Sequence, residues 1–178
     1  MSELAAATTG DGDVQPDWVS AAEFKSVFRR HPSGVAVITF TEGERLYGFT
    51  ATSVISVSAE PPVLAFSIDS RSSSWPPLAR AEHLAISFLA AGQVDLSARF
   101  ATSGIDKFAH GGFSLLTSGE PILDGSTAWM QGEIVQRTPV GASYLVSVLV
   151  LHASEPTDVA PLVYHDRAYH HVGDHSAL

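Results

Sequence analysis

The chain has 178 residues, of which 45% are hydrophobic, and carries a formal net charge of −9 at pH 7. This length fits one domain with a sizeable core, and the acidic balance argues against a nucleic-acid partner, because phosphate backbones require a basic face. The absence of cysteine excludes disulfides, thiolate metal sites and cysteine nucleophiles.

No apolar run approaches the roughly 18–20 residues of a membrane span, and the N-terminal segment lacks the basic start and apolar stretch of a signal peptide. We therefore expect a cytoplasmic protein without a membrane partner. Residues 1–17 are mostly Ala, Thr, Gly and Asp and predict a disordered tail. One domain at residues 18–173 and a short tail at 174–178 complete the expected organisation.

The domain is expected to begin with a helix. Ser20 and Glu23 have the spacing of a capping box, and Val19 and Phe24 are placed to close a hydrophobic staple. The pattern predicts about three helical turns that end before Pro32.

Short strand-like runs separated by turn signals follow and favour a barrel. The run at 144–151 is apolar on both faces, so one side should face the barrel interior and the other a helix or a second subunit. A short helix is expected around Val94 to Phe100. The predicted strands are Gly34–Thr41, Leu46–Ser58, Val63–Ile68, Leu84–Leu89, Thr127–Gln136, Ser143–His152 and Leu162–Val172.

Small residues, three of which carry hydroxyls, interrupt the second of these strands at Thr50, Ala51, Thr52 and Ser53. A core strand ordinarily carries bulky side chains. Small residues let a flat ligand lie against the backbone, while N–H and hydroxyl groups fix its orientation. The alternative is an ordinary strand with a polar outer face.

A second polar segment, at 69–78, contains one arginine, a run of serines and two prolines. Prolines suit the first turn of a helix. Backbone N–H groups at a helix start, the hydroxyls of Ser72, Ser73 and Ser74, and a cation together suit a phosphate group. The alternative is a solvated turn.

In this order and spacing, the two segments resemble the short-chain flavin reductase family. Its members are split-barrel proteins that hold FMN or FAD and reduce it with NADH or NADPH. The resemblance spans roughly Phe24 to Val172 and also rests on Phe28–Thr39, Ala98-Arg99-Phe100, Asp106-Lys107-Phe108 and Pro161-Leu162-Val163-Tyr164. It implies a mainly β fold, a six-stranded split β-barrel with flanking helices that forms a homodimer.

The resemblance implies a flavin site in which Arg99 or Lys107 meets the phosphate. The alternative for this region is an amphipathic helix and loop with solvated cations. Asp69 stands where family members often carry Asn, and a carboxylate accepts but does not donate a hydrogen bond. The implied cofactor residues are Ser33, Thr50, Ala51, Thr52, Ser53, Asp69, Ser72, Ser73, Ser74, Arg99, Phe100, Lys107 and Phe108.

The resemblance also implies a nicotinamide site formed by Ser143, Tyr164 and His165. The chain departs from the family here, because Gly141-Ala142-Ser143 replaces the Gly-Asp-His of many reductases. His165 is a candidate to take over part of the missing histidine's role. We expect no catalytic side chain, because the redox chemistry belongs to the cofactors and the protein positions them.

Histidines near the C-terminus, at 165, 170, 171 and 175, do not predict a metal site. Residues five apart in one strand face opposite ways, so His165 and His170 are not expected to converge. No spacing matches a zinc motif.

The leading hypothesis is therefore an NAD(P)H-dependent flavin reductase that binds FMN, with FAD as the alternative flavin. It would deliver reduced flavin by diffusion to a partner monooxygenase. The alternative is a split-barrel protein without reductase activity that binds flavin, deazaflavin or heme as a carrier or sensor.

Overall fold

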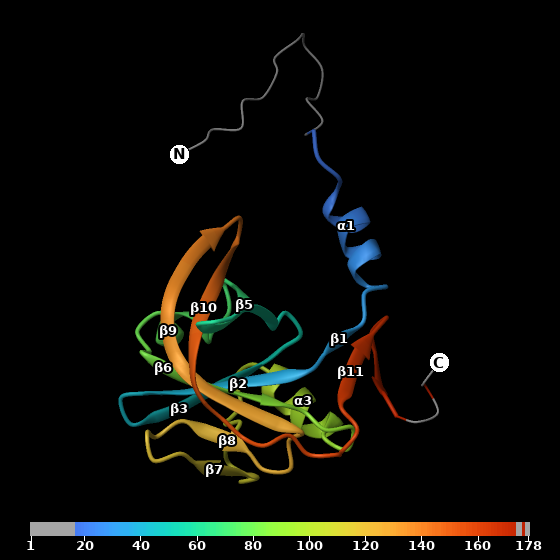
Figure 1. The fold of residues 1–178 in the computed structure, drawn as a ribbon. Helices are drawn as coiled ribbons and strands as arrows, with labels where there is room; N and C mark the ends of the chain where they lie inside the picture. The colour runs from blue at the N-terminus through green and yellow to red at the C-terminus, as the bar shows by residue number, and fades with distance from the viewer. Residues whose placement is uncertain (1–16, 174–175, 177–178) are drawn as a thin grey trace.

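The computed structural model describes residues 17–173 and 176 (Figure 1). The predicted disordered tail up to residue 16, and all of the predicted C-terminal tail except Ser176, lie outside the described residues. The fold is mainly β, as predicted, with the helices α1 (Ala21–Phe28), α2 (Trp75–Leu78) and α3 (Val94–Ala101).

Helix α1 begins with the predicted capping box. The Ser20 hydroxyl accepts a hydrogen bond from the Glu23 N–H at 3.2 Å, and a Glu23 carboxylate oxygen accepts from the Ser20 N–H at 2.9 Å. The helix stands away from the barrel, and all of its residues are exposed (Figure 1). Its apolar face, which includes the packed rings of Phe24 and Phe28, is therefore left open in the single chain.

Seven antiparallel strands form the main sheet, in the order β3-β2-β6-β9-β10-β5-β4, so the prediction of six was wrong. The predicted strand at 46–58 is broken at 52–54, which separates β3 from β4 and adds the seventh strand. The strands of this sheet are β2 (Ala36–Glu42), β3 (Arg45–Ala51), β4 (Ile55–Ala59), β5 (Pro62–Asp69), β6 (His83–Phe88), β9 (Ala128–Val140) and β10 (Ser143–Ala153).

The predicted C-terminal strand is a hairpin. Asp166 and Arg167 adopt left-handed φ values of 47° and 66°, and the chain reverses there between β11 (Leu162–His165) and β12 (Ala168–His171). These strands join β1 (Ser33–Gly34) in a small sheet of order β1-β11-β12. A third sheet, β7 (Phe113–Leu115) with β8 (Pro121–Leu123), was not predicted.

The hairpin shows that one expectation about the C-terminal histidines was wrong. The rings of His165 and His170 lie with centroids 5.8 Å apart, although they were expected to face opposite ways. That expectation assumed one continuous strand. The turn places the two residues diagonally on neighbouring strands, where they share a face.

The main sheet curls around one hydrophobic core. Its long curved strands in Figure 1 are β9 and β10. Side chains at alternate positions of the strands fill it, including Phe40, Phe66, Ile86 and Val146. A second cluster, with Val37 and Phe100, lies between this sheet and α3.

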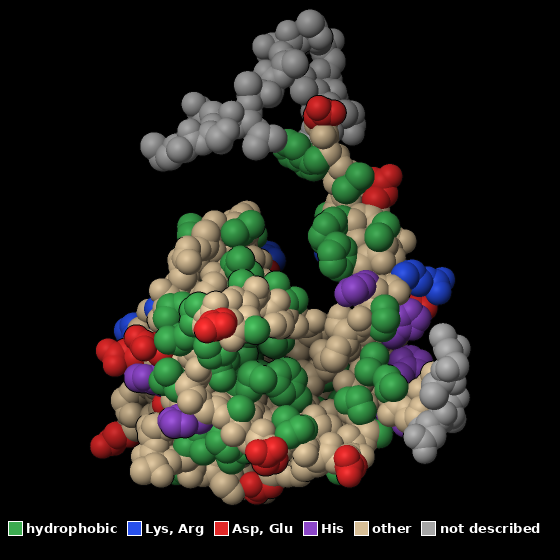
Figure 2. All heavy atoms as spheres, in the orientation of Figure 1, with side chains coloured by type: hydrophobic (Ala, Val, Ile, Leu, Met, Phe, Trp, Pro, Cys, Tyr) green, Lys and Arg blue, Asp and Glu red, His purple; other side chains and the backbone are tan. Residues whose placement is uncertain are grey.

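The outer side of β10 is only partly covered. Val146 and Val148 are buried, whereas Leu145 and Leu151 are 38% and 45% exposed. Hydrophobic side chains also gather on α1 and on the barrel face toward it (Figure 2). No helix in residues 17–173 combines the length and the apolar character required to cross a bilayer.

Candidate functional site

Two adjoining cavities lie where β3, the end of β5 and the segment after α3 meet. The smaller cavity, about 280 Å³, is lined by Thr50, Asp69, Ser72, Ser73, Ser74, Phe100 and Lys107, with five further residues. The larger cavity, about 660 Å³, is lined by the segments 45–48 and 104–108 together with Ser73 and Ser74. Ser73, Ser74 and Lys107 line both cavities, so residues predicted from two distant segments meet at their junction.

The segment that carries Ser72, Ser73 and Ser74, called the serine segment below, follows β5 after a tight turn at Asp69. One Asp69 carboxylate oxygen accepts hydrogen bonds from the Arg71 N–H at 2.8 Å and from Nε at 3.0 Å, and the other accepts from Nη2 at 2.8 Å. These bonds lower the pKa of Asp69 to about 2. The Asp69 carboxylate is thus charged at neutral pH and paired with Arg71 within its own turn.

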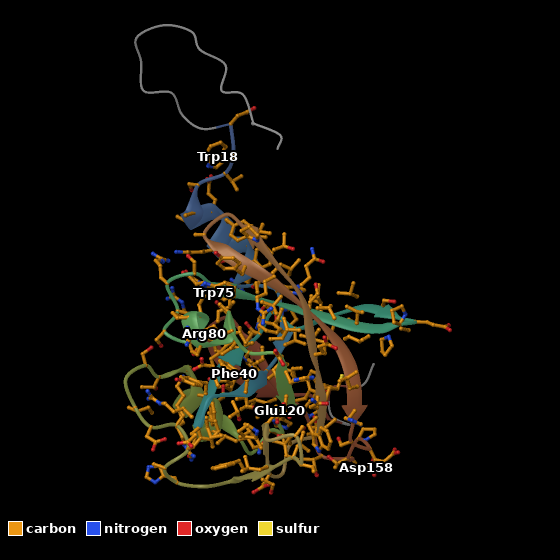
Figure 3. All side chains as sticks on the ribbon, turned by 90° about the vertical axis from the view of Figure 1, so that its left-hand side faces the viewer. Trp18, Phe40, Trp75, Arg80, Glu120 and Asp158 are labelled. Atoms are coloured by element: carbon orange, nitrogen blue, oxygen red, sulfur yellow. The ribbon has the colours of Figure 1, made fainter. Side chains whose placement is uncertain are left out.

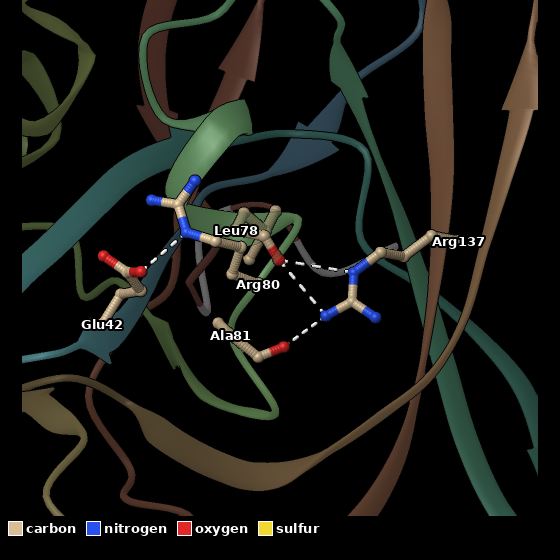
Figure 4. A network of polar contacts seen from close by, with 5 residues as sticks. All are labelled: Glu42, Leu78, Arg80, Ala81 and Arg137. Atoms are coloured by element: carbon tan, nitrogen blue, oxygen red, sulfur yellow. Dashed lines mark hydrogen bonds and ion pairs between the residues drawn. The ribbon is translucent and has the colours of Figure 1, made fainter.

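Helix α2 follows the serines, with prolines in its first turn as predicted. Arg137 of β9 binds carbonyls at and just beyond the end of this helix. Its Nη2 donates to Leu78 O at 3.2 Å and also to Ala81 O. Arg80 in turn donates from Nε to Glu42 at 2.7 Å (Figure 4). Figure 3 shows Trp75 and Arg80 on the barrel, well away from Trp18. These bonds fix the helix that presents Ser74 to the cavities.

Of the two predicted cations, Lys107 lines the cavities and Arg99 does not. Its half-buried Nζ donates to Gly48 O at 2.8 Å and to Phe100 O at 2.7 Å. An ammonium has three donors, so one remains for a ligand. Burial lowers the pKa of Lys107. Arg99 lines neither cavity, and its buried Nη1 has no hydrogen-bond partner among the described residues.

The four residues from Thr50 to Ser53 have different roles in the structure. Thr50 lines the smaller cavity, and its hydroxyl donates to Ser97 O of α3 at 2.7 Å. Ser53 accepts from the Ser67 N–H at 3.0 Å and so ties the break between β3 and β4 to β5. Ala51, Thr52 and Ser53 do not line either cavity.

The predicted nicotinamide residues fall in two places. Ser143 lies opposite Asp69 in the β10–β5 pair, and the Ser70 N–H donates to Ala142 O at 3.0 Å. Tyr164 and His165 instead lie in the small sheet, where Ser33 pairs with Tyr164. These three line neither cavity.

A polar chain nevertheless connects the small sheet with the smaller cavity. Ser97, whose carbonyl binds Thr50, has its hydroxyl 3.0 Å from the Tyr169 hydroxyl. The Tyr169 ring packs against Tyr164 with centroids 5.2 Å apart. Tyr164 is therefore linked to the Thr50 wall through α3.

Sequence reasoning missed most of the larger cavity, including Arg45, Tyr47 and Ile105. Arg45 and Tyr47 alternate along one face of a strand, which is a signal that the sequence does carry. Which face points to a cavity depends on long-range packing, and the sequence does not show it. The described residues contain no cluster of three or more His, Asp or Glu side chains suited to a metal ion.

The donor set at the junction fits a flavin phosphate. Ser72, Ser73, Ser74 and the Lys107 ammonium are among the groups that line the smaller cavity, and hydroxyl and cationic donors are the groups that bind phosphate oxygens. The apolar walls from Phe49, Ile68 and Phe100 suit a flat ring.

Comparison with known proteins agrees with this fold. Residues 28–173 match the flavin reductase like domain. An NADH:FMN oxidoreductase from Rhodococcus erythropolis is 42% identical over an alignment of 157 residues, which covers 85% of this chain and 82% of that protein. The reductase subunit HsaB of a flavin-dependent monooxygenase from Rhodococcus jostii is 30% identical over 95% of this chain and 85% of its own length.

A solved structure gives the same result for the fold. The flavin reductase domain protein from Arthrobacter sp. FB24 superposes with a TM-score of 0.81 at 37% identity, covering 85% of this chain and 95% of that one. The chain belongs to the flavin reductase-like domain family, whose fold is a split barrel. Its relatives include NADH:FMN oxidoreductases and reductase subunits of monooxygenases.

Proposed function

We propose that the protein is an NAD(P)H-dependent flavin reductase that binds FMN. The observation that carries the proposal is the convergence of Ser72, Ser73, Ser74 and Lys107 on one cavity beside the β3 strand. The 42% identity to NADH:FMN oxidoreductases supports FMN as the flavin and NADH as the reductant, with FAD and NADPH as the alternatives.

In this proposal each part of the site has a separate task. The serine hydroxyls and the third Lys107 donor bind the phosphate, and Phe49, Thr50 and Phe100 form the wall for the ring. A bound flavin would supply the acceptor for a hydride from the reduced nicotinamide. The protein orients the two rings and keeps the phosphate charge neutralised.

The test is a spectrum and a turnover assay. Purified protein should bind FMN and oxidise NADH or NADPH when FMN is added. A protein that binds FMN but oxidises neither nicotinamide would remove the reductase activity while the flavin site remained.

Delivery of the reduced flavin to a partner monooxygenase is the proposed use of the activity. It is supported by the relative that is the reductase subunit of a flavin-dependent monooxygenase. Coupled product formation by such an oxygenase across a dialysis membrane, with the two proteins kept apart, would demonstrate transfer by diffusion. A cytoplasmic location stays a prediction of the sequence.

A homodimer is proposed on the open apolar surfaces of α1 and β10. Phe24, Val27 and Phe28 are each more than half exposed, and an eight-residue helix is too short to be stable in water without packing. Light scattering should give twice the chain mass, and Phe24→Asp with Phe28→Asp should reduce it to one. A monomeric wild-type protein would contradict the dimer.

A second candidate function is flavin binding without reductase activity, as a carrier or sensor. The hairpin at 141–143, which lacks the family's Asp and His, is directly bonded to the serine segment and favours this candidate. Turnover in a chain that carries both Ala142→Asp and Ser143→His separates the two. A large gain indicates that the natural hairpin limits reductase activity.

A further inference from the structure

The Tyr169 hydroxyl is a polar group close to the cavities to which the proposed function gives no role. Tyr169 lies in β12 of the small sheet, and its hydroxyl is 3.0 Å from the hydroxyl of Ser97 in α3. Ser97 is 0% exposed. A hydrogen bond in such a dry environment is stronger than one in water. The small sheet is therefore joined to the middle of α3 by a buried polar contact.

Helix α3 forms part of the wall of the smaller cavity. Phe100 and Ala101 line this cavity and lie one turn beyond Ser97. The Phe100 ring lies directly on β3 at Gly48, where an added Cβ atom would come within 2.6 Å of the ring carbon Cε1. Interiors packed this closely transmit small displacements. A shift of α3 would therefore change the shape of the cavity.

Ser97 also fixes the hydroxyl of Thr50. Thr50 lines the smaller cavity from β3, and its hydroxyl donates to Ser97 O at 2.7 Å. A threonine hydroxyl has one proton and two lone pairs. Because the proton is held by Ser97, the oxygen has only lone pairs left for a ligand. The Thr50 side chain is thus a hydrogen-bond acceptor as long as Ser97 stays in place.

A fixed acceptor in this wall distinguishes the two redox states of a flavin. The reduced flavin ring carries N–H groups that the oxidised ring lacks, and hydrogen bonds to the ring nitrogens tune the cofactor. An acceptor binds such N–H groups, whereas a freely rotating hydroxyl also donates to the bare nitrogens of the oxidised ring. The arrangement at Thr50 therefore favours the reduced ring.

We propose that Tyr169 is a positioning residue, which holds α3 through Ser97 and so keeps Thr50 as an acceptor that favours reduced flavin. The inference rests on the proposed function, because it requires that the flavin ring lies against Thr50. Tyr169 lines neither cavity and so does not touch the ligand itself. Its effect reaches the site through two hydrogen bonds, one between the hydroxyls of Tyr169 and Ser97 and one from Thr50 to Ser97 O.

The test compares Tyr169→Phe with the wild type in titrations with oxidised FMN and, under anaerobic conditions, with chemically reduced FMN. The measured quantity is the ratio of the two dissociation constants. Tyr169→Phe should shift this ratio in favour of oxidised FMN by about three- to tenfold. A purely structural role of Tyr169 would weaken the binding of both forms equally and leave the ratio unchanged.

A double variant separates positioning from stability. Tyr169→Phe alone leaves the Ser97 hydroxyl buried without a partner, which lowers stability. Tyr169→Phe combined with Ser97→Ala removes both hydroxyls, so the melting temperature should return toward that of the wild type. The shifted ratio should remain, because α3 is still released from the small sheet.

Variants of Thr50 test whether the effect passes through its oxygen. Thr50→Val should shift the ratio as Tyr169→Phe does, and the two changes together should give no further shift, because both remove the same acceptor. Thr157→Val is the matched control and should keep the wild-type ratio. The exposed Thr157 hydroxyl also donates to a carbonyl, Thr127 O at 3.2 Å, but it lines neither cavity.

Three results would overturn the inference. An unchanged ratio in Tyr169→Phe would mean that Tyr169 only supports the fold. Additive shifts from Thr50→Val and Tyr169→Phe would mean that Tyr169 does not act through Thr50. Both of these results leave the proposed flavin site intact. A wild type that binds neither form of FMN would instead contradict that site and, with it, this inference.

Discussion

Tyr144 stacks on Trp75, with ring centroids 3.7 Å apart and planes inclined by 16°. Tyr144 lies at the start of β10, directly after the altered hairpin, and Trp75 is the first residue of α2, directly after the three serines. The contact therefore joins the hairpin that carries Ser143, a predicted nicotinamide residue, to the proposed phosphate site.

We expect Tyr144→Ala to weaken FMN binding by about three- to tenfold, because the serine segment loses the ring that holds it. An aromatic pair adds about 0.5–1.5 kcal/mol beyond its buried area. Fluorescence titration with FMN measures the change. Tyr144→Phe keeps the stack and should bind as the wild type does. Equal affinity in Tyr144→Ala and wild type would show that the contact does not support the site.

Asp69 is expected to lower the affinity for FMN slightly, because its charge occupies Arg71 beside the phosphate site. Asp69→Asn should release Arg71 and strengthen FMN binding about two- to fivefold at low salt. Its folded pKa of about 2 lies below the ordinary 3.8. The stability from this pairing is therefore fully present above about pH 4 and lost toward pH 2.

Both parts of this prediction can be checked separately. FMN titrations of Asp69→Asn at low and high salt test the electrostatic origin, since the gain should shrink as salt screens it. Acid unfolding curves test the linkage. The wild type should lose more stability between pH 4 and 2 than Asp69→Asn does. Superimposed acid transitions would contradict the assignment.

Arg137 is expected to support the site from a distance. Its guanidinium donates to carbonyls at the end of α2, and burial lowers its pKa. Arg137→Met should reduce the free energy of unfolding by about 1–3 kcal/mol, because charged hydrogen bonds are lost. FMN affinity should fall as well.

Glu42→Gln is the matched comparison for Arg137. It weakens the exposed pair with Arg80 on the other side of the same helix end. Surface ion pairs contribute about 0–1 kcal/mol, so this variant should remain close to wild type. Denaturant unfolding compares the two. Equal effects would mean that Arg137 has no special role.

Much of the site could be predicted from the sequence, because local chemistry defines it. The capping box and the prolines of α2 follow from residue types in order along the chain. A site that combines Ser72 to Ser74 with Arg99 or Lys107 was implied by the family resemblance. The choice of Lys107 over Arg99 could not be predicted, since it depends on which side of α3 faces the cavities.

The breaks in two predicted strands could also not be predicted from the sequence. Residues 46–58 are apolar enough for one strand, but Thr52 to Val54 leave the sheet so that β3 and β4 can form opposite edges. The turn at Asp166 and Arg167 uses left-handed φ values without glycine, and Asp166 is its one common turn residue, a weak signal inside a strand-like run. Both are tertiary effects that local propensity does not contain.

Gly132 is expected to be essential for the β9–β10 pair. A Cβ atom there would lie 2.2 Å from Leu149 O, a backbone atom that cannot rotate away. Gly132→Ala should reduce stability by about 1–3 kcal/mol, as overpacked cores do. Gly92→Ala is the control, because no atom lies within 4 Å of its added Cβ. Thermal unfolding of both variants checks the prediction, and equal melting temperatures would contradict it.

Lys107 should make the affinity for FMN depend on pH. Burial lowers its pKa from the ordinary 10.5, so it loses its charge at a lower pH than an exposed lysine does. FMN affinity should therefore decline on the alkaline side below pH 10.5, while riboflavin affinity stays constant. Lys107→Arg should remove this decline, because arginine keeps its charge.

The most direct test of the account is a fluorescence titration of the protein with FMN and with riboflavin, in wild type and in Lys107→Gln. The wild type should bind FMN at least about tenfold more tightly than riboflavin, and Lys107→Gln should bring the two affinities close together. A wild type that does not quench FMN fluorescence, or that binds both flavins equally, would contradict a phosphate site formed by Lys107 and the serines.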